Sequence, residues 1–419
     1  MILFLLAEAH AFCGTYVGEE GASLVNRASQ VVLARYGEQT TLSVAMDYEG
    51  AAAEFGLLLP VPQVLTAENV KTVDPQLFAR LDEFSTPRQV AYTCDDVVTE
   101  GHDEGSLGCM FAQDYALEAS RDAAGAYDSG STVVIESEFS VAGYDIVVLS
   151  AEEADGLTAW LDDNGYSVPS GGEAVLQEYI SGGSYFLAAK VSLELTGESA
   201  WLPPLQFTYE SDVLGLPIRI GTISADGPQE VVIYGLSTSP VAIANYAEAE
   251  VEDECMWKDD GDGFAAYYED QLDAAFADEA SWVREYEWSL TANCDPCTRV
   301  SGMMPEELAE LGLPEYHGYL TRLRMRYTPD QATQDVVLYE TSPGGGDTGW
   351  GGGTGEQIRY IDYVEELEYL FPVCGEGMVE NPGTCLAGEP QVGCAARTST
   401  RGAGVAVLLL AAAAIRRRR

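Results

Sequence analysis

Cys294 and Cys297 have the spacing of a Cys-x-x-Cys motif, which serves as a redox centre, a disulfide or half of a metal site. A redox centre needs its first cysteine at a helix N-terminus, because the helix lowers the pKa of the thiol. Pro296 and the residues after Cys297 do not begin a helix, so a structural disulfide or loop staple is favoured. A zinc site would need a second ligand pair, and beyond residue 11 the only histidines are His102 and His317.

Two glycine-containing segments resemble ligand-binding motifs by their letters alone. Residues 259–263, Asp-Asp-Gly-Asp-Gly, suggest a calcium loop, but counting from Asp260 places Phe264 where an EF-hand loop needs an oxygen ligand. Residues 344–349 match the G-x-G-x-x-G fingerprint of dinucleotide binding, yet no strand-helix-strand unit surrounds them. We interpret the first as a solvated acidic turn and the second as chance. The sequence therefore predicts no catalytic residue, no cofactor and no metal ligand.

Motifs of common hydrolases and nucleotide-binding enzymes are missing as well. The sequence has no G-x-S-x-G, no H-E-x-x-H and no Walker A lysine. With 68 acidic residues, a carboxylate pair at glycosidase spacing can be imagined anywhere in the chain, so it carries no weight as a prediction.

The charge of the chain excludes one large class of function. Its 419 residues carry 68 Asp and Glu against 21 Lys and Arg, a formal net charge of −47. Nucleic-acid binding needs clustered basic residues that displace counterions from phosphates, and anionic membrane surfaces disfavour such a chain for the same reason. At 47% hydrophobic residues the chain can bury a core, and its length predicts two or three domains.

The clearest structural signal is the alternation of apolar and polar residues over 41–48, which predicts a strand with one buried face. It belongs to a predicted antiparallel meander, whose run 55–59 is ended by Pro-Val-Pro at 60–62. Further strands are predicted at 132–139, 144–149, 184–195, 205–209, 218–224, 230–236, 320–327 and 335–340, and helices at 75–84, 151–164, 174–180, 264–276 and 305–311. No regular βαβ period connects them, which predicts an α+β fold with mixed, largely antiparallel sheets and a few packed helices.

Composition predicts two packed subdomains followed by a hydrophobic tail helix. The predicted segments are a truncated signal peptide at 1–11, an N-terminal β-meander and helix subdomain at 12–130, a central α+β subdomain at 131–247, a region with the Cys-x-x-Cys loop at 248–342, a glycine-rich linker and disulfide turn at 343–393, and a sorting tail at 394–419.

The N-terminus predicts export. Residues 1–6 are apolar, and Ala9 and Ala11 fit the A-x-A cleavage rule, which leaves Phe12 as the first mature residue. The basic segment that normally precedes the apolar run is missing, which indicates a start inside the true signal peptide. A buried N-terminal strand is the alternative.

The C-terminus predicts a membrane tether. Cys394 is followed by a polar spacer, the apolar run 402–415 and four arginines at 416–419. As a helix the run rises ~21 Å, short of the ~30 Å hydrocarbon core, so it is a marginal span. The terminal arginines favour a cytoplasmic end, which places the rest of the chain outside the cytoplasm. The tail resembles the sorting signals of myxobacterial exported proteins, which implies that Cys394 is a processing or lipidation site. A plain short tail anchor is the alternative.

Cysteine number fits an exported protein. The chain has nine cysteines, and assigning Cys394 to sorting leaves an even set suited to an oxidising compartment. Flanking sequence makes Cys94 and Cys109 one candidate disulfide and Cys374 and Cys385 another, while Cys294 and Cys297 are candidates whose partners stay open together with those of Cys13 and Cys255.

Several segments together resemble a known family. They are residues 12–17 (Phe-Cys-Gly-Thr-Tyr-Val), 30–32 (Gln-Val-Val), Phe55 with 57–62 (Leu-Leu-Leu-Pro-Val-Pro), 86–88 (Thr-Pro-Arg), 144–149 (Tyr-Asp-Ile-Val-Val-Leu), 160–166 (Trp-Leu-Asp-Asp-Asn-Gly-Tyr) and 294–297 (Cys-Asp-Pro-Cys). In these segments the chain resembles the domain of unknown function 2330 family, from about Phe12 to Glu340. The resemblance implies an exported, often surface-anchored bacterial protein without assigned activity, and it supplies no catalytic residues.

These observations favour a non-enzymatic surface binding or structural module, located outside the cytoplasm in the cell envelope or on the outer surface. The expected partners are the sorting and processing machinery, the membrane through the tail, and an unknown surface ligand, but no nucleic acid. The alternative is an envelope hydrolase with an unrecognised carboxylate site. Convergent carboxylates with raised pKa would favour the enzyme, and an exposed apolar patch would favour the binding module.

Overall fold

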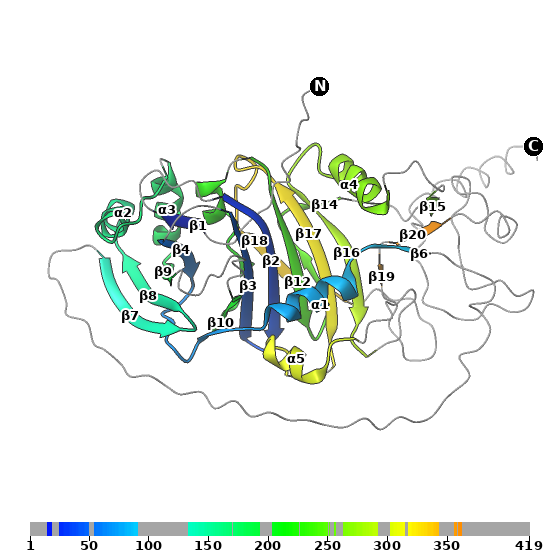
Figure 1. Cartoon of the computed structure of the whole chain (residues 1–419), viewed down its shortest axis with the longest axis horizontal. Coiled ribbons are helices and arrows are strands. Elements are labelled where there is room, and N and C mark those ends of the chain that lie inside the picture. Colours follow the sequence, from blue (N-terminus) through cyan, green and yellow to red (C-terminus); the bar gives the residue numbers. More distant parts are fainter. Residues whose placement is uncertain are drawn as a thin grey trace, which may run out of the picture.

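The computed structural model describes residues 15–18, 25–49, 54–90, 133–169, 171–192, 203–225, 227–249, 251, 255–256, 263–291, 302–314, 317–342, 356–357 and 359–362. Its main elements lie in four layers, in the order helices, sheet, sheet, helices (Figure 1). The largest apolar cluster fills the space between the two sheets.

The larger sheet has nine strands drawn from distant parts of the chain. In spatial order they are β14 (Ala247–Glu248), β16 (Ser281–Ser289), β17 (Tyr319–Tyr327), β12 (Gln229–Ser237), β2 (Val25–Tyr36), β3 (Gln39–Glu49), β10 (Leu205–Glu210) and β5 (Val70–Thr72), with β19 (Glu356–Gln357) also beside β16. The pairs β2–β12 and β14–β16 are parallel, and the other neighbours are antiparallel.

The remaining strands form three smaller sheets. An antiparallel five-stranded sheet has the order β1 (Thr15–Gly18), β4 (Glu54–Val61), β9 (Tyr185–Ser192), β8 (Tyr144–Ala151) and β7 (Val133–Val141). Two three-stranded sheets consist of β11 (Leu214–Leu216), β18 (Val336–Glu340) and β13 (Val241–Ile243), and of β15 (Cys255–Met256), β20 (Arg359–Asp362) and β6 (Arg88–Val90).

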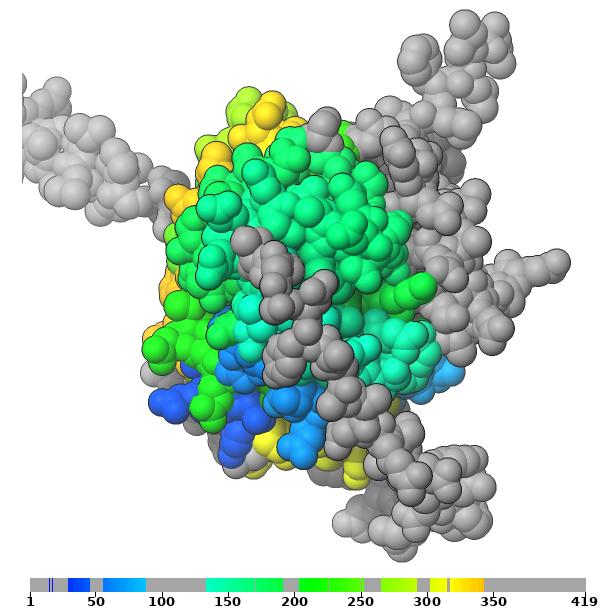
Figure 2. All heavy atoms as spheres, turned by 90° about the vertical axis from the view of Figure 1, so that its left-hand side faces the viewer, coloured from blue at the N-terminus to red at the C-terminus, as the bar shows by residue number. Residues whose placement is uncertain are grey.

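Alternation along the strands explains the layering. On β4, Leu57 and Leu59 point into the core between the sheets, whereas Leu58 points to the other side. That other side is covered by α2 (Ala154–Asp163), α3 (Gly172–Ser181) and the 3₁₀ helix η3 (Ile220–Ser224). Figure 2 views this end of the molecule, where β7 to α3 form the cyan-to-green surface. The far face of the nine-stranded sheet is covered by α1 (Pro75–Ser85), α4 (Gly263–Ala275) and α5 (Pro305–Glu310).

The α+β prediction is confirmed, with mixed sheets, mostly antiparallel pairs and a few packed helices. The predicted strand over 41–48 lies within β3, and the predicted helix over 75–84 is α1. The helices predicted at 151–164, 174–180, 264–276 and 305–311 correspond to α2, α3, α4 and α5.

The strand predicted at 218–224 is wrong, because this segment forms η3. Its amides bond to side chains and to a local turn instead of a neighbouring strand: Arg219 N donates to Asp335 (3.1 Å), Ile220 N to the Tyr179 hydroxyl (3.3 Å) and Thr222 N to the Arg219 carbonyl (3.0 Å). Of the isoleucines that suggested a strand, Ile220 is buried and Ile223 partly buried against α2 and α3, whereas Ile218 belongs to the core between the sheets.

The predicted meander is also incorrect in its third strand. β2 and β3 form an antiparallel hairpin, but β4 leaves for the five-stranded sheet, and Pro60 does not end it, since it pairs with Phe186 of β9. The pairing of β1 with β4 stops at Leu58. Among the described strands, β4 therefore has an open side at Pro60, where a missing N–H group removes no ladder bond.

The predicted segments 12–130, 131–247 and 248–342 all contribute strands to the nine-stranded sheet, and the subdomain boundaries stay a prediction. The signal peptide at 1–11 and the tail at 394–419 lie outside the described residues. Within the described part of the chain, no helix combines the length and the apolar character that a membrane span requires.

Candidate functional site

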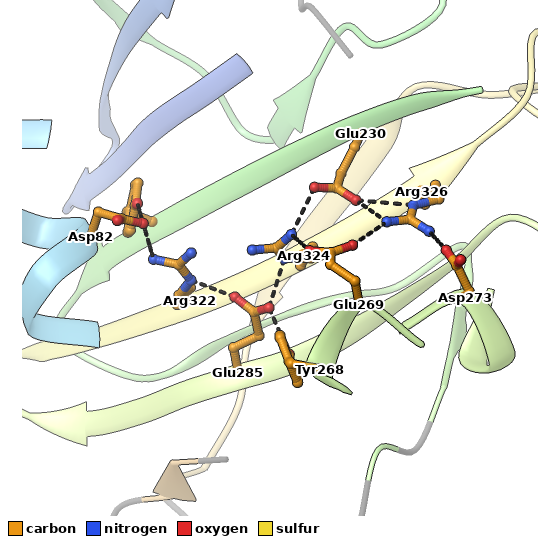
Figure 3. A network of polar contacts seen from close by, with 10 residues as sticks. Asp82, Glu230, Tyr268, Glu269, Asp273, Glu285, Arg322, Arg324 and Arg326 are labelled. Carbon is orange, nitrogen blue, oxygen red and sulfur yellow. Dashed lines mark hydrogen bonds and ion pairs between the residues drawn. The ribbon is translucent and has the colours of Figure 1, made fainter. Parts of the chain in front are cut away.

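One face of β17 carries an arginine at three alternate positions: Arg322, Arg324 and Arg326. Side chains two residues apart on a strand point to the same face. The intervening Leu323 and Met325 point to the core between the sheets. We call the three arginines the arginine ladder. Figure 3 shows the ladder with acidic residues from both neighbouring strands, β12 and β16, and from the helices above them.

Arg322 is the most buried member, with 2% of its side chain exposed. Its Nη1 donates to Asp82 Oδ1 (2.7 Å) and to the Tyr234 hydroxyl (3.1 Å), and its Nε donates to Glu285. The guanidinium also lies 5.4 Å from the centre of the Tyr234 ring. Asp82 is positioned by α1, whose N-terminus is capped by the Asp74 carboxylate. Carboxylates therefore hold this buried cation on two sides.

Arg324 and Arg326 share the carboxylates of β12 and α4. Arg324 Nη1 donates to Glu230 Oε1 (2.8 Å), and Arg326 makes two bonds to Glu230 Oε2, from Nε (2.9 Å) and Nη2 (2.7 Å). From α4, Glu269 lies 3.5 Å from Arg324 and 3.2 Å from Arg326. Asp273, one turn further along α4, accepts from Arg326 Nη1 at 2.5 Å. The outer end of the ladder is thus bound to both a strand and a helix.

A β-bulge in β16 brings Glu285 to the ladder. Arg284 lies opposite Leu323 and Tyr286 opposite Arg322, so Glu285 is the extra residue between them. A bulge of this kind redirects a side chain and changes which residues face the core. Here Tyr286 joins the apolar cluster beneath α1, while the Glu285 side chain lies against the arginines.

Glu285 is completely buried, and three groups hold its charge. Arg322 Nε contacts one carboxylate oxygen, and Arg324 Nε lies 2.7 Å from the other as an ion pair. The Tyr268 hydroxyl of α4 donates to Oε1 at 2.7 Å. Burial acts to raise the pKa of Glu285, but Arg324 and Arg322 together outweigh it and hold that pKa below its usual range. Glu285 is therefore an ionised carboxylate in a dry position.

Glu269 has the opposite electrostatic balance. Burial raises its pKa above the usual range, and Arg324 and Arg326 counteract this only in part, with Glu230 adding repulsion. About half of its side chain is exposed, at 48%. Two carboxylates that contact the same Arg324 thus differ. The surroundings of Glu285 favour its anionic form, whereas partial burial disfavours the charge on Glu269.

This geometry is better suited to holding the helices and strands together than to catalysing a reaction. General acid-base catalysis needs a group whose pKa lies near the working pH, within reach of a substrate. The most buried carboxylate, Glu285, is instead held ionised by two arginines. Against the effect of burial, Tyr234 and Glu285 raise the pKa of Arg322, and Glu285 and Glu230 raise that of Arg324. Across the described residues, no group of three or more His, Cys, Asp or Glu side chains is arranged to hold a metal ion.

A second polar cluster joins the helical layer to the start of β18. Asp335 accepts a hydrogen bond from the Tyr179 hydroxyl of α3 (2.7 Å) and another from Arg219 N (3.1 Å). Arg219 also pairs with Glu178 on α3. Burial raises the pKa of Asp335, and its hydrogen bonds offset this in part. The cluster fixes three segments to one another through a single carboxylate.

Comparison with known families shows what kind of protein carries this site. Residues 7–339 match the family described as "Uncharacterized protein conserved in bacteria (DUF2330)". The chain belongs to this family. The DUF2330 match includes every ladder residue and its partners, from Asp82 to Arg326. No curated protein and no solved structure matches the chain.

Most of the cysteine predictions concern residues that the structure does not describe. The six candidate disulfide cysteines and the sorting cysteine lie outside the described residues: Cys94, Cys109, Cys294, Cys297, Cys374, Cys385 and Cys394. Their pairing and processing stay predictions for this DUF2330 protein. Cys255 lies in β15, where its backbone pairs with Ile361.

The ladder was missed by motif reasoning, although the sequence contained a signal. Three of the 21 basic residues of a strongly acidic chain alternate within the predicted strand 320–327. Alternating arginines on a strand that must be buried require acidic partners. That argument predicts an ion-pair network from the sequence, but it does not identify the carboxylates.

Proposed function

We propose that this DUF2330 protein is exported, anchored to the cell envelope, and acts as a non-enzymatic surface binding or structural module. The observation that carries the non-enzymatic part is the state of Glu285. Its carboxylate is fully buried and held ionised by Arg322 and Arg324, so it stabilises the sheet and is not poised for proton transfer.

Exposed apolar side chains support a binding role. Val213, directly before β11, is 53% exposed, and Val337 and Tyr339 on β18 are 36% and 50% exposed. β11 and β18 are neighbours in one sheet, so these side chains offer an apolar contact surface to a ligand or partner.

The envelope location is supported by the two chain ends and the family. Residues 1–6 with Ala9 and Ala11 resemble a cleavable leader, and Cys394 with the apolar run and terminal arginines resembles a sorting tail. The family is bacterial. Sorting and processing machinery and the membrane are the partners that follow from this proposal.

Mass spectrometry of the protein isolated from its native envelope tests the proposal. We expect a mature chain that begins at Phe12, a processed or lipid-bearing Cys394, and oxidised cysteines in the body. A cytosolic chain with reduced cysteines and an intact tail at 416–419 would contradict the location.

The alternative, a carboxylate-based hydrolase, has less support. Such an enzyme needs two convergent carboxyl groups, one of them with a raised pKa. Among the described carboxyl groups, those with raised pKa are Glu269 and Asp335. Asp335 has no contact with the ladder, since it binds Tyr179 and the Arg219 backbone. Glu269 converges with Glu285 on Arg324, but Glu285 is fully buried, so this pair offers a substrate a single accessible carboxyl group.

A further inference from the structure

α4 is attached to the nine-stranded sheet differently from the other helices on that face. Its buried apolar contacts are limited to one small cluster of Tyr268, Leu272, Phe276 and Val283, with partly buried neighbours. α1 and α5 instead share a much larger apolar cluster with the centre of the sheet. The attachment of α4 therefore depends more on its polar contacts.

Apart from the buried hydrogen bond from the Tyr268 hydroxyl to Glu285, those polar contacts lie near the surface. The side chains of Glu269 and Asp273 are 48% and 69% exposed, and both pair with Arg326. Because they are one helical turn apart, they face the ladder together (Figure 3). Ion pairs this exposed contribute little individually and are weakened by salt.

Releasing α4 would leave the ladder intact. Arg324 and Arg326 would keep Glu230 of β12 as a partner. Glu285 would lose the Tyr268 hydroxyl but keep both of its counter-charges, Arg322 and Arg324. No fully buried charge would lose its last counter-charge. The sheet can therefore stay folded while the helix moves away, which distinguishes α4 from an element of the core.

We propose that α4 is a detachable lid on the arginine ladder, held by its small apolar cluster and the ion pair between Asp273 and Arg326, and released by salt while both large sheets stay folded. Opening uncovers Val283 and the Arg324–Arg326 edge, and it exposes the apolar side of α4. This inference concerns the fold and holds whether or not the protein is anchored to the envelope.

Salt acts on the rest of the molecule in the opposite direction. At a net charge of −47, self-repulsion opposes the compact state, and screening reduces that repulsion. Salt should therefore protect the sheets while it releases α4. A detached helix of 13 residues is only marginally stable in water, so its amides become open to exchange.

Hydrogen exchange with mass spectrometry on the full-length protein tests the lid at about 0.01 M and about 1 M NaCl, where the Debye length falls from ~30 to ~3 Å. We expect exchange of residues 263–275 to rise about threefold at high salt, as the loss of one exposed ion pair implies. Exchange in β12 and β17 should fall or stay constant. The variant Asp273→Asn should show the fast exchange already at low salt and respond little to added salt, whereas Glu269→Gln should not speed the exchange, because burial disfavours the charge on Glu269.

Glu178→Gln is the matched control. Glu178 lies on another helix, α3, and its similarly exposed carboxylate also pairs with an arginine, Arg219. This variant should leave the exchange of 263–275 and its salt response unchanged. The lid is excluded if salt slows the exchange of α4 along with that of the sheets, or if Asp273→Asn keeps the wild-type exchange and salt response in residues 263–275.

Discussion

The outer face of the nine-stranded sheet is apolar beneath α1 and α5 and charged beneath α4, although β12 and β17 run through both halves. On β12, Val232 and Leu236 belong to the apolar cluster, whereas Glu230 binds the ladder. On β17, Leu320 is apolar and the next residues on that face are the arginines. One half is stabilised by the packing of buried apolar side chains, and the other by ion pairs between arginines and carboxylates.

This difference predicts how each half responds to substitution. An apolar contact can lose a few methyl groups and relax partly into the cavity. A buried ion pair that loses one partner leaves the other charge without compensation, which costs more than the pair itself contributes. The charged half should therefore be the more sensitive to single substitutions, without being the more stable.

The largest expected effect is that of Arg322→Met. It removes the cation that Glu285 and Asp82 share, and we expect a loss of about 3–5 kcal/mol in the free energy of unfolding at neutral pH. Leu320→Ala, on the same face of the same strand, is the control in the apolar half, with an expected loss of about 2–5 kcal/mol. Denaturant unfolding measures both.

Lowering the pH should change the stability losses of these two variants differently. In Arg322→Met, Glu285 keeps only Arg324 as a counter-charge, so it takes up a proton more readily than in the wild type as pH falls. The loss should therefore shrink in acid, whereas the loss in Leu320→Ala should not change. Equal pH dependence in the two variants would contradict the conclusion that one half of the sheet face is held by charge and the other by apolar contacts.

A smaller effect is expected from the pH dependence of Glu285 itself. Its folded pKa is lowered, so its contribution to stability is complete above the unfolded value of about 4.3 and is lost as pH falls further. Glu269 has the opposite sign, because its folded pKa is raised and protonation favours the folded state. Comparing the wild type with each Glu→Gln variant from pH 7 to pH 3 isolates the two contributions from the general relief of repulsion.

The sequence predicts those helices and strands in which the spacing of apolar residues marks the buried face. The alternation over 41–48 and the apolar spacing of 75–84 describe one buried face each, and β3 and α1 follow from them. The path of β4 through Pro60 and the turn at 218–224 depend instead on distant partners, namely β1, β9, Tyr179 and Asp335.

The arginine ladder, too, could be predicted from the sequence only in part. The alternating arginines are visible in β17, but Arg322 binds Glu285, 37 residues away, and Asp82, 240 residues away. With 68 acidic residues, periodicity does not select these two. The bulge that inserts Glu285 into the ladder depends on pairing between β16 and β17, and no local signal marks it.

The central claim is that the carboxylates around β17 hold the structure and do not perform chemistry. The most direct test is the free energy of unfolding of Glu285→Gln and Glu269→Gln, measured side by side at pH 7. Glu285→Gln should lose about 3 kcal/mol, because two buried arginines each lose the most buried of their counter-charges. Glu269→Gln should be neutral or stabilising, because burial disfavours its charge. A gain in stability for Glu285→Gln, as expected when a strained catalytic group is neutralised, would contradict the account.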